Sequence, residues 1–160
     1  MNKNTGFSII EIVIAAAIIV TLVTAAAGAW QLYFKVSRTS NQNTQAALLT
    51  GEAAEALNLL RDSGWTANIS PLSLGTTYYL YWNGDTYATS TTPILIDNSP
   101  YSISFVFSEI RRDTTSDNIV SSGGAVDIHT RSVVISIMSS SSPPMTVMQS
   151  SLLLHDVYKN

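Results

Sequence analysis

The chain has 160 residues, a net charge of −3, 46 % hydrophobic residues and only 12 % charged residues. Soluble globular proteins contain about 25 % charged residues, so this sequence is unusually poor in charge. The eight Lys and Arg residues are scattered and predict no basic face, which excludes a nucleic-acid-binding protein. The absence of cysteine excludes disulfides, iron–sulfur clusters and thiol catalysis.

The N-terminal segment over residues 7–34 is almost entirely apolar. Thirteen of its residues are Ile, Val, Leu or Phe, and the 23 residues between Glu11 and Lys35 carry no charge. As a helix, this run is long enough to cross about 30 Å of hydrocarbon. Its side chains favour insertion by roughly 4–8 kcal/mol, which outweighs the ~2.5–3.5 kcal/mol cost of one carboxylate. We therefore predict a membrane-spanning helix with Glu11 near one of its ends.

After Lys35 the pattern predicts that the helix continues to about residue 62 and becomes one-sided. Four apolar residues recur at helical spacing and form one stripe: Leu49, Ala53, Leu57 and Leu60. Glu52 and Glu55 lie off this stripe, as solvated side chains do. Gly64 is typical of the position just beyond a helix end.

From Trp65 onward the sequence predicts short strands. Aromatic residues fill positions 78–82 and end at Asn83-Gly84, the strongest short signal for a β-hairpin. Apolar residues alternate with polar or smaller ones over 101–108 and 133–137, which is typical of half-buried strands, and 145–149 is a further candidate. The predicted fold class is α+β, a long N-terminal helix packed on a small antiparallel sheet.

A short polar leader precedes the apolar run and meets it at a glycine–aromatic step. Residues 1–6 carry one cation, Lys3, and end at Gly6; Phe7 follows, and Glu11 stands four residues further on. This combination resembles the N-terminal signal of type IV prepilins and pseudopilins. The segment over residues 38–65 is similar to the second half of their long helix.

The resemblance implies a division of the chain into three parts. Residues 1–6 would be a leader peptide, and residues 7–34 would form a transmembrane and filament-core helix. Residues 35–160 would form a globular pilin domain, in which an amphipathic helix over 35–62 packs on a sheet over 65–160.

The resemblance also implies how the chain is processed and with what it assembles. A prepilin peptidase would cleave between Gly6 and Phe7 and N-methylate Phe7. The other partners would be pilins or pseudopilins of the same filament and an inner-membrane assembly platform. The chain would be a single-pass protein of the bacterial inner membrane with its domain outside the cytoplasm, and then part of an extracellular or periplasmic filament. No cofactor, metal or catalytic residue is expected.

Glu11 is the expected assembly residue. In an apolar environment an unpaired carboxylate and an unpaired ammonium are each costly, so a neighbouring subunit that brings its Phe7 amine to Glu11 would select a register. Gly28 stands where many major pilins have a proline in this helix, and the cysteines of their C-terminal loop are missing. Both departures favour a minor pilin or pseudopilin.

Alternatives to this interpretation remain open. The chain could be a monomeric signal-anchored binding module, in which Glu11 is only a tolerated interfacial charge. Residues 25–28 (Ala-Ala-Ala-Gly) could be a signal-peptidase site. The aromatic residues over 78–82 could form a ligand-stacking surface, although a sheet core is favoured.

Two further groups of polar residues are candidate sites. Asp113, Asp117 and Asp127 are expected in a Gly/Ser-rich loop, where they could bind calcium; their spacing fits no EF-hand, so solvated loop acids are favoured. His129 and His155 belong to no recognisable catalytic motif, which favours a surface role and disfavours an enzyme.

Overall fold

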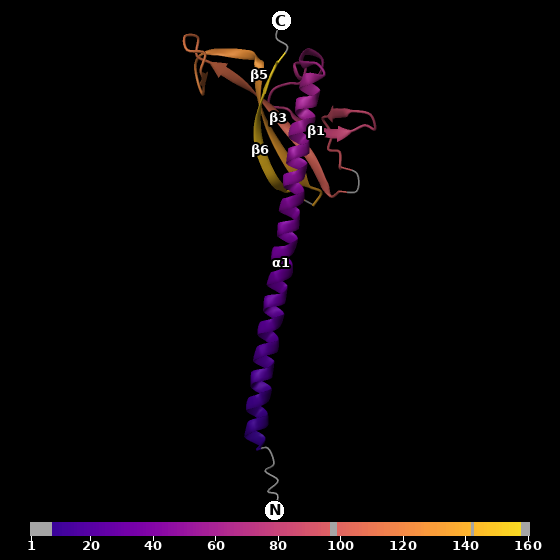
Figure 1. The fold of residues 1–160 in the computed structure, drawn as a ribbon, viewed down its shortest axis with the longest axis vertical. Coiled ribbons are helices and arrows are strands. Elements are labelled where there is room, and N and C mark those ends of the chain that lie inside the picture. Colours follow the sequence, from indigo (N-terminus) through magenta and orange to yellow (C-terminus); the bar gives the residue numbers. More distant parts are fainter. Residues whose placement is uncertain (1–7, 97–98, 142, 158–160) are drawn as a thin grey trace, which may run out of the picture. The chain divides into compact units, whose positions relative to one another are not determined.

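The fold is α+β, as predicted, with one long N-terminal helix and a six-stranded antiparallel sheet (Figure 1). The computed structural model describes residues 8–96, 99–141 and 143–157. Helix α1 runs without interruption over Ile9–Asp62. The chain divides into two compact units, Met1–Asn41 and Gln42–Asn160, so the sheet and the C-terminal part of α1 belong to the same unit.

The sheet is a nearly sequential meander of antiparallel strands. Its strands are β1 (Thr77–Trp82), β2 (Tyr87–Ser90), β3 (Tyr101–Arg112), β4 (Ile119–Val120), β5 (Ala125–Ser139) and β6 (Thr146–His155). Their order in the sheet is β2-β1-β3-β5-β6, and β4 pairs with β3 outside this path. The four predicted strands and the hairpin at Asn83-Gly84 are therefore confirmed, and three of those strands are considerably longer than predicted.

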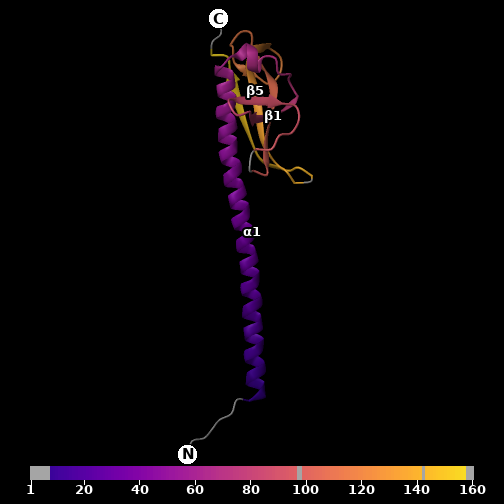
Figure 2. The same ribbon diagram turned by 90° about the vertical axis from the view of Figure 1, so that its right-hand side faces the viewer.

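The core of the second unit lies between the C-terminal part of α1 and one face of the sheet, which the two views of the ribbon both show (Figures 1 and 2). The helix contributes small and branched side chains: Ala46, Ala53, Ala56, Leu57 and Leu60. Larger side chains come from the sheet, among them Leu80, Phe105, Phe107, Ile135 and Leu154. The alanines allow the helix to lie close to the sheet, and the predicted apolar stripe is confirmed.

The aromatic cluster over residues 78–82 is divided between the core and solvent. Tyr78 stacks on Phe105 with ring centroids 5.8 Å apart, and Leu80 is buried. Trp82 is 56 % exposed and meets Tyr87 edge to face at 5.2 Å. The preference for a sheet core therefore holds for the first part of the cluster, whereas the end of β1 presents aromatic surface to solvent.

The prediction that strands begin at Trp65 is wrong, because Trp65–Ile69 forms a single wide helical turn. The Ser70 backbone nitrogen closes the turn by donating to the Trp65 carbonyl at 2.8 Å. Trp65 and Ile69 are both buried, so the turn places two large apolar side chains in the core.

Arg131 on β5 holds the end of this turn against the sheet. Its Nη1 donates to the carbonyls of Ile69 and Leu72, each at 2.7 Å, and its Nη2 donates to the Ser70 carbonyl at 2.8 Å. The guanidinium also lies 5.6 Å from the centroid of the Phe107 ring. Burial lowers the pKa of Arg131, and the three carbonyls compensate for the water that the charge has lost.

Beyond a bulge between Glu109 and Ile110, β3 and β5 continue as a narrow extension whose loop depends on glycine. Gly124 has a φ of 64°, and an added Cβ would collide with the carbonyl oxygen of Arg112. Gly123 has a similar φ of 73° but has open space around it.

The two glycines therefore form a matched pair for mutation. Gly124→Ala should lower the free energy of unfolding by roughly 3 kcal/mol, the upper end of the cost of a strained backbone position. Gly123→Ala should cost about 1–2 kcal/mol, because only the left-handed backbone is penalised. Urea unfolding of both variants would measure the difference, and equal costs would contradict the collision with Arg112.

The second unit should fold without the apolar part of α1, since its core is built within the unit. A fragment over residues 35–160 is expected to be a soluble monomer with the helix and strand content of the intact domain. Circular dichroism and analytical ultracentrifugation would test this. An unfolded or polydisperse fragment would mean that the helix and the sheet form their common core only when the N-terminal segment is present.

Candidate functional site

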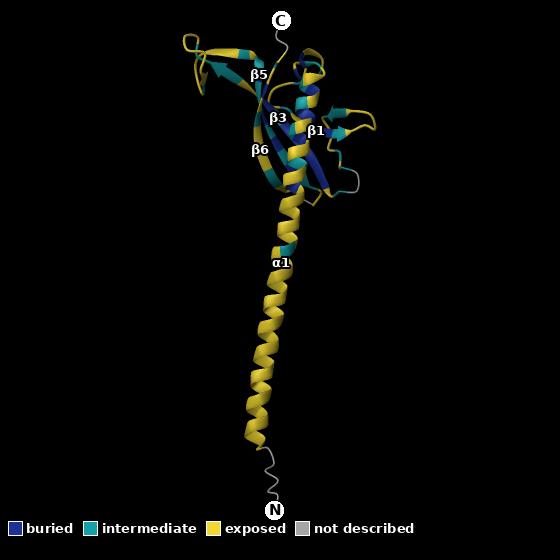
Figure 3. Cartoon of the chain, in the orientation of Figure 1, coloured by how far each residue is buried: buried dark blue, intermediate teal, exposed yellow. Residues whose placement is uncertain are grey.

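The first part of α1 exposes an uninterrupted apolar surface. All large apolar side chains from Ile9 to Val36 are between 46 % and 81 % exposed, and this part of the helix is uniformly exposed (Figure 3). Monomeric soluble proteins rarely expose contiguous apolar patches of more than a few hundred Å². The segment is long and apolar enough to cross a membrane.

The two threonines within this segment do not disturb its apolar character. The Thr21 hydroxyl donates to the Ala17 carbonyl at 2.7 Å, and the Thr24 hydroxyl lies 3.0 Å from the Val20 carbonyl and 2.9 Å from the Thr21 carbonyl. Each hydroxyl is therefore satisfied by a carbonyl of its own helix. The helix also continues through Gly28 without a break.

Glu11 lies in the first turn of α1 and caps the helix. Its Oε2 accepts a hydrogen bond from the Ser8 backbone nitrogen at 2.9 Å, and the Ser8 carbonyl accepts from the nitrogens of Glu11 and Ile12 at 3.0 and 3.2 Å. A carboxylate at this end of a helix is also favoured by the helix dipole. The signal for this contact was present in the sequence, because Ser8-Ile-Ile-Glu11 matches the capping-box pattern S-x-x-E.

The predicted cleavage and methylation sites, Gly6 and Phe7, lie outside the described residues. The structure therefore places only Glu11 among the three residues of the predicted N-terminal site. Ser8, which is not among the predicted site residues, is its contact there.

Aromatic and basic residues mark the other end of the apolar segment. Trp30 and Tyr33 are 67 % and 69 % exposed, and their rings lie 5.8 and 6.0 Å from that of Phe34. Lys35 and Arg38 follow and are exposed. Amphipathic aromatic rings next to cations are typical of the boundary between hydrocarbon and lipid headgroups.

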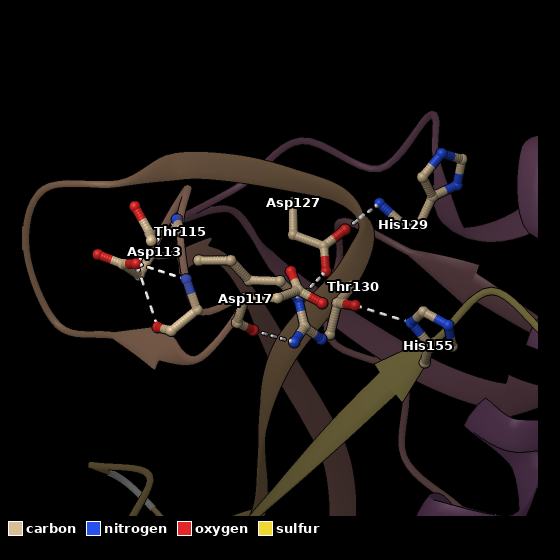
Figure 4. A network of polar contacts seen from close by, with 9 residues as sticks. Asp113, Thr115, Asp117, Asp127, His129, Thr130 and His155 are labelled. Atoms are coloured by element: carbon tan, nitrogen blue, oxygen red, sulfur yellow. Dashed lines mark hydrogen bonds and ion pairs between the residues drawn. The ribbon is translucent and has the colours of Figure 1, made fainter.

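The prediction that Asp127 is a solvated loop acid is wrong. Asp127 lies on β5, its side chain is 12 % exposed, and its carboxylate accepts from Arg112 Nε at 2.7 Å and from the His129 backbone nitrogen at 2.9 Å (Figure 4). Burial alone would raise the pKa of Asp127, but hydrogen bonds from Thr130, Arg112 and His129 together lower it below its usual range. Strand β5 therefore extends into the Gly/Ser-rich segment, where Arg112 on β3 is the partner of Asp127.

The other two aspartates of this group, Asp113 and Asp117, make local contacts. Asp113 accepts hydrogen bonds from the backbone nitrogens of Thr115 and Ser116 at 2.9 and 2.8 Å, and these bonds lower its pKa. Asp117 has a φ of 57°, and its backbone carbonyl accepts a hydrogen bond from Arg112 Nη1 at 3.0 Å. Within the described part of the chain, no three acidic or histidine side chains are gathered to hold a metal ion.

The two histidines have separate partners. His155 Nδ1 lies 2.8 Å from the Thr130 hydroxyl, which is buried, and His129 Nδ1 lies 3.4 Å from the Asp156 carboxylate. Both contacts join the end of β6 to β5. These geometries tie the last strand to the sheet.

No family model matches this chain, and no curated protein or solved structure matches it either.

Proposed function

We propose that the chain is a structural subunit of a type IV pilus or type II secretion pseudopilus, stored in a membrane and assembled through its N-terminal helix. The single observation that carries the proposal is the uncovered apolar part of α1 with one carboxylate, Glu11, in its first turn. A helix that is apolar on all sides can exchange lipid for neighbouring helices with little change in hydrophobic free energy. Assembly from the membrane then needs a contact that fixes how far one helix is displaced along its neighbour.

Glu11 can supply that contact in the mature chain. Cleavage after Gly6 would leave a charged amine on Phe7, and the amine of a neighbouring subunit would find in Glu11 the only carboxylate of the apolar segment. A carboxylate has about four acceptor positions, and the bond from Ser8 uses one of them. Capping its own helix therefore leaves Glu11 able to accept from a second chain.

The proposed partners and location follow from this role. A prepilin peptidase that also methylates Phe7 would process the chain, and an inner-membrane platform would transfer it into the filament. Before assembly the chain would be a single-pass protein of the bacterial inner membrane with the sheet domain outside the cytoplasm. The absence of cysteine and the glycine at position 28 favour a minor subunit over a major adhesive pilin.

The processing step can be tested on protein from the native cell. The mature chain should begin at Phe7 with a methylated α-amine, because Gly6 ends the polar leader. Mass spectrometry of the N-terminal peptide decides this. An intact Met1, or a chain that begins after residues 25–28, would contradict the proposal.

One observation favours a second function, a monomeric membrane-anchored binding module. The capping bond from Ser8 to Glu11 gives the carboxylate a role within a single chain, so its presence does not by itself require assembly. In such a module, replacing Glu11 would change only the end of the helix. The variants at this position therefore separate the two functions.

A further inference from the structure

A small apolar pocket in the second unit opens between α1 and the β1–β2 hairpin. Its volume is about 240 Å³, and Trp82 and Tyr87 line it together with apolar side chains of residues 94–96. Glu52 on α1 is the one charged residue among the described residues that line it. An apolar pocket with one carboxylate suits a ligand that has both an apolar stem and a cationic end.

The acidic side of this pocket lacks a cation. Glu52 Oε1 accepts a hydrogen bond from the Tyr87 hydroxyl at 2.9 Å, and Glu55 stands less than one turn further along the helix. No ion pair of either glutamate occurs in the described chain. Burial raises the pKa of Tyr87, and so do its bond to Glu52 and the charges of both glutamates. Two like charges three residues apart on a helix repel each other, so an added cation would relieve a cost.

The aromatic side of the pocket is open to a ligand. Trp82 is 56 % exposed and stands edge to face with Tyr87 at a centroid distance of 5.2 Å. Lysine and arginine cations are attracted to the faces of such rings, tryptophan most strongly. The exposed Trp82 ring and the two glutamates therefore favour the same class of ligand, a basic side chain.

The chain itself carries a matching basic turn, formed by Lys35 and Arg38. These are the only charged residues between Glu11 and Glu52, and both are exposed. Neither has an ion pair within the described residues. Charged side chains on one helix pair when they are three or four residues apart. Lys35 and Arg38 are much further than that from Glu52 and Glu55 along the helix. The basic turn and the glutamates can therefore complement each other between two chains.

We propose that the pocket at Glu52, with Glu55 beside it, receives the basic turn of a second copy of this chain. Lys35 and Arg38 of the second copy meet the two glutamates, and one of their aliphatic stems lies against Trp82. The contact matches two positive charges with two negative ones and leaves no charge unpaired at the interface. It deepens the proposed filament function and rests on it, because it requires that copies assemble side by side.

Charge reversal in full-length chains tests this contact. One variant carries Lys35→Glu and Arg38→Glu, a second carries Glu52→Lys and Glu55→Lys, and a third carries all four changes. Pairs of differently tagged chains are co-expressed in the native cell, cross-linked in the membrane and in sheared filaments, and co-purified. Glu109→Lys reverses an exposed charge on β3 and serves as the control.

Each two-residue variant should co-purify with itself about tenfold less than the original chain does, since like charges then meet. The two variants expressed together, and the fourfold variant with itself, should recover most of the association. Glu109→Lys should associate normally. Trp82→Ala should weaken association, and Trp82→Phe should retain part of it.

The other outcomes are equally decisive. If the original chain co-purifies with itself and both reversed variants do so equally, the proposed contact is wrong while the filament function stands. If only reversal of Lys35 and Arg38 matters, and the glutamate variant does not restore it, the basic turn binds another group such as lipid phosphate, and the contact is again overturned. If the original chain never associates, the filament function itself fails, and the contact fails with it.

Discussion

Glu11→Ala is expected to abolish incorporation into filaments while membrane insertion and processing stay intact. Insertion should even improve, because the change removes the one charge from an apolar span that is already sufficient. Assembly should fail because the Phe7 amine of a neighbour would be buried without its partner, which costs roughly 3–5 kcal/mol. Cell fractionation would compare the membrane pool with sheared filaments.

Two further substitutions separate the two roles of Glu11, the ion pair with a neighbour's Phe7 amine and the hydrogen bond that caps its own helix. Glu11→Gln keeps an oxygen that can accept the hydrogen bond from Ser8 but removes the charge, so its assembly should be intermediate. Glu11→Lys should assemble worse than the alanine variant, because two cations would meet. Normal assembly of Glu11→Ala would leave only the capping role and would support the anchored binding module.

The second large effect is expected at Arg131. Arg131→Ala should lower the free energy of unfolding of the sheet domain by about 3 kcal/mol, because two part-buried hydrogen bonds to carbonyls are lost, at ~1–3 kcal/mol for each group left without a partner. The third bond is exposed, so water can replace it. The carbonyls concerned are those of Ile69, Ser70 and Leu72. Arg131→Lys should recover only part of the loss, since an ammonium does not have the planar fork of a guanidinium. Urea unfolding of the full chain in detergent, followed by near-UV circular dichroism, measures the effect.

Arg111 provides the matched control one strand away. It makes an ion pair with Glu109 at 2.8 Å, and both side chains are about 40 % exposed. Exposed pairs of this kind contribute about 0–1 kcal/mol, so Arg111→Ala should change stability by no more than that. Equal effects at the two arginines would mean that charge, and not the three carbonyl contacts, decides the stability.

The helix and the longer strands were predictable because their patterns are local. A span over Ile9–Asp62 follows from an apolar run and then a one-sided stripe, and β3 and β5 follow from alternation around Phe105 and Ile135. The two-residue strand β4 is too short to show any period. The sequence signal for each element therefore scales with the number of residues over which its pattern repeats.

The features that were missed depend on partners far away in the chain. The turn at Trp65–Ile69 is stabilised by an arginine 62 residues after Ile69, and no local pattern announces that contact. Asp127 sits close to glycines and serines in the sequence, and its partners on β3, the paired backbone and Arg112, lie 15 or more residues earlier. The capping bond of Glu11 is different, because its S-x-x-E signal is local and was hidden by the more conspicuous match to a processing signal.

The order of strands has a consequence for the rate at which the domain forms. Every pairing in the sheet joins strands that follow one another in the chain or that are separated by one short strand, so loop closure costs little and the meander should form quickly. The contacts of the sheet with α1 and with the turn at Trp65–Ile69 close longer loops. The separation is 35 residues between Glu52 and Tyr87, and 62 residues between Ile69 and Arg131. We therefore expect these contacts to form after the rate-limiting step, so that their loss speeds unfolding and hardly slows folding.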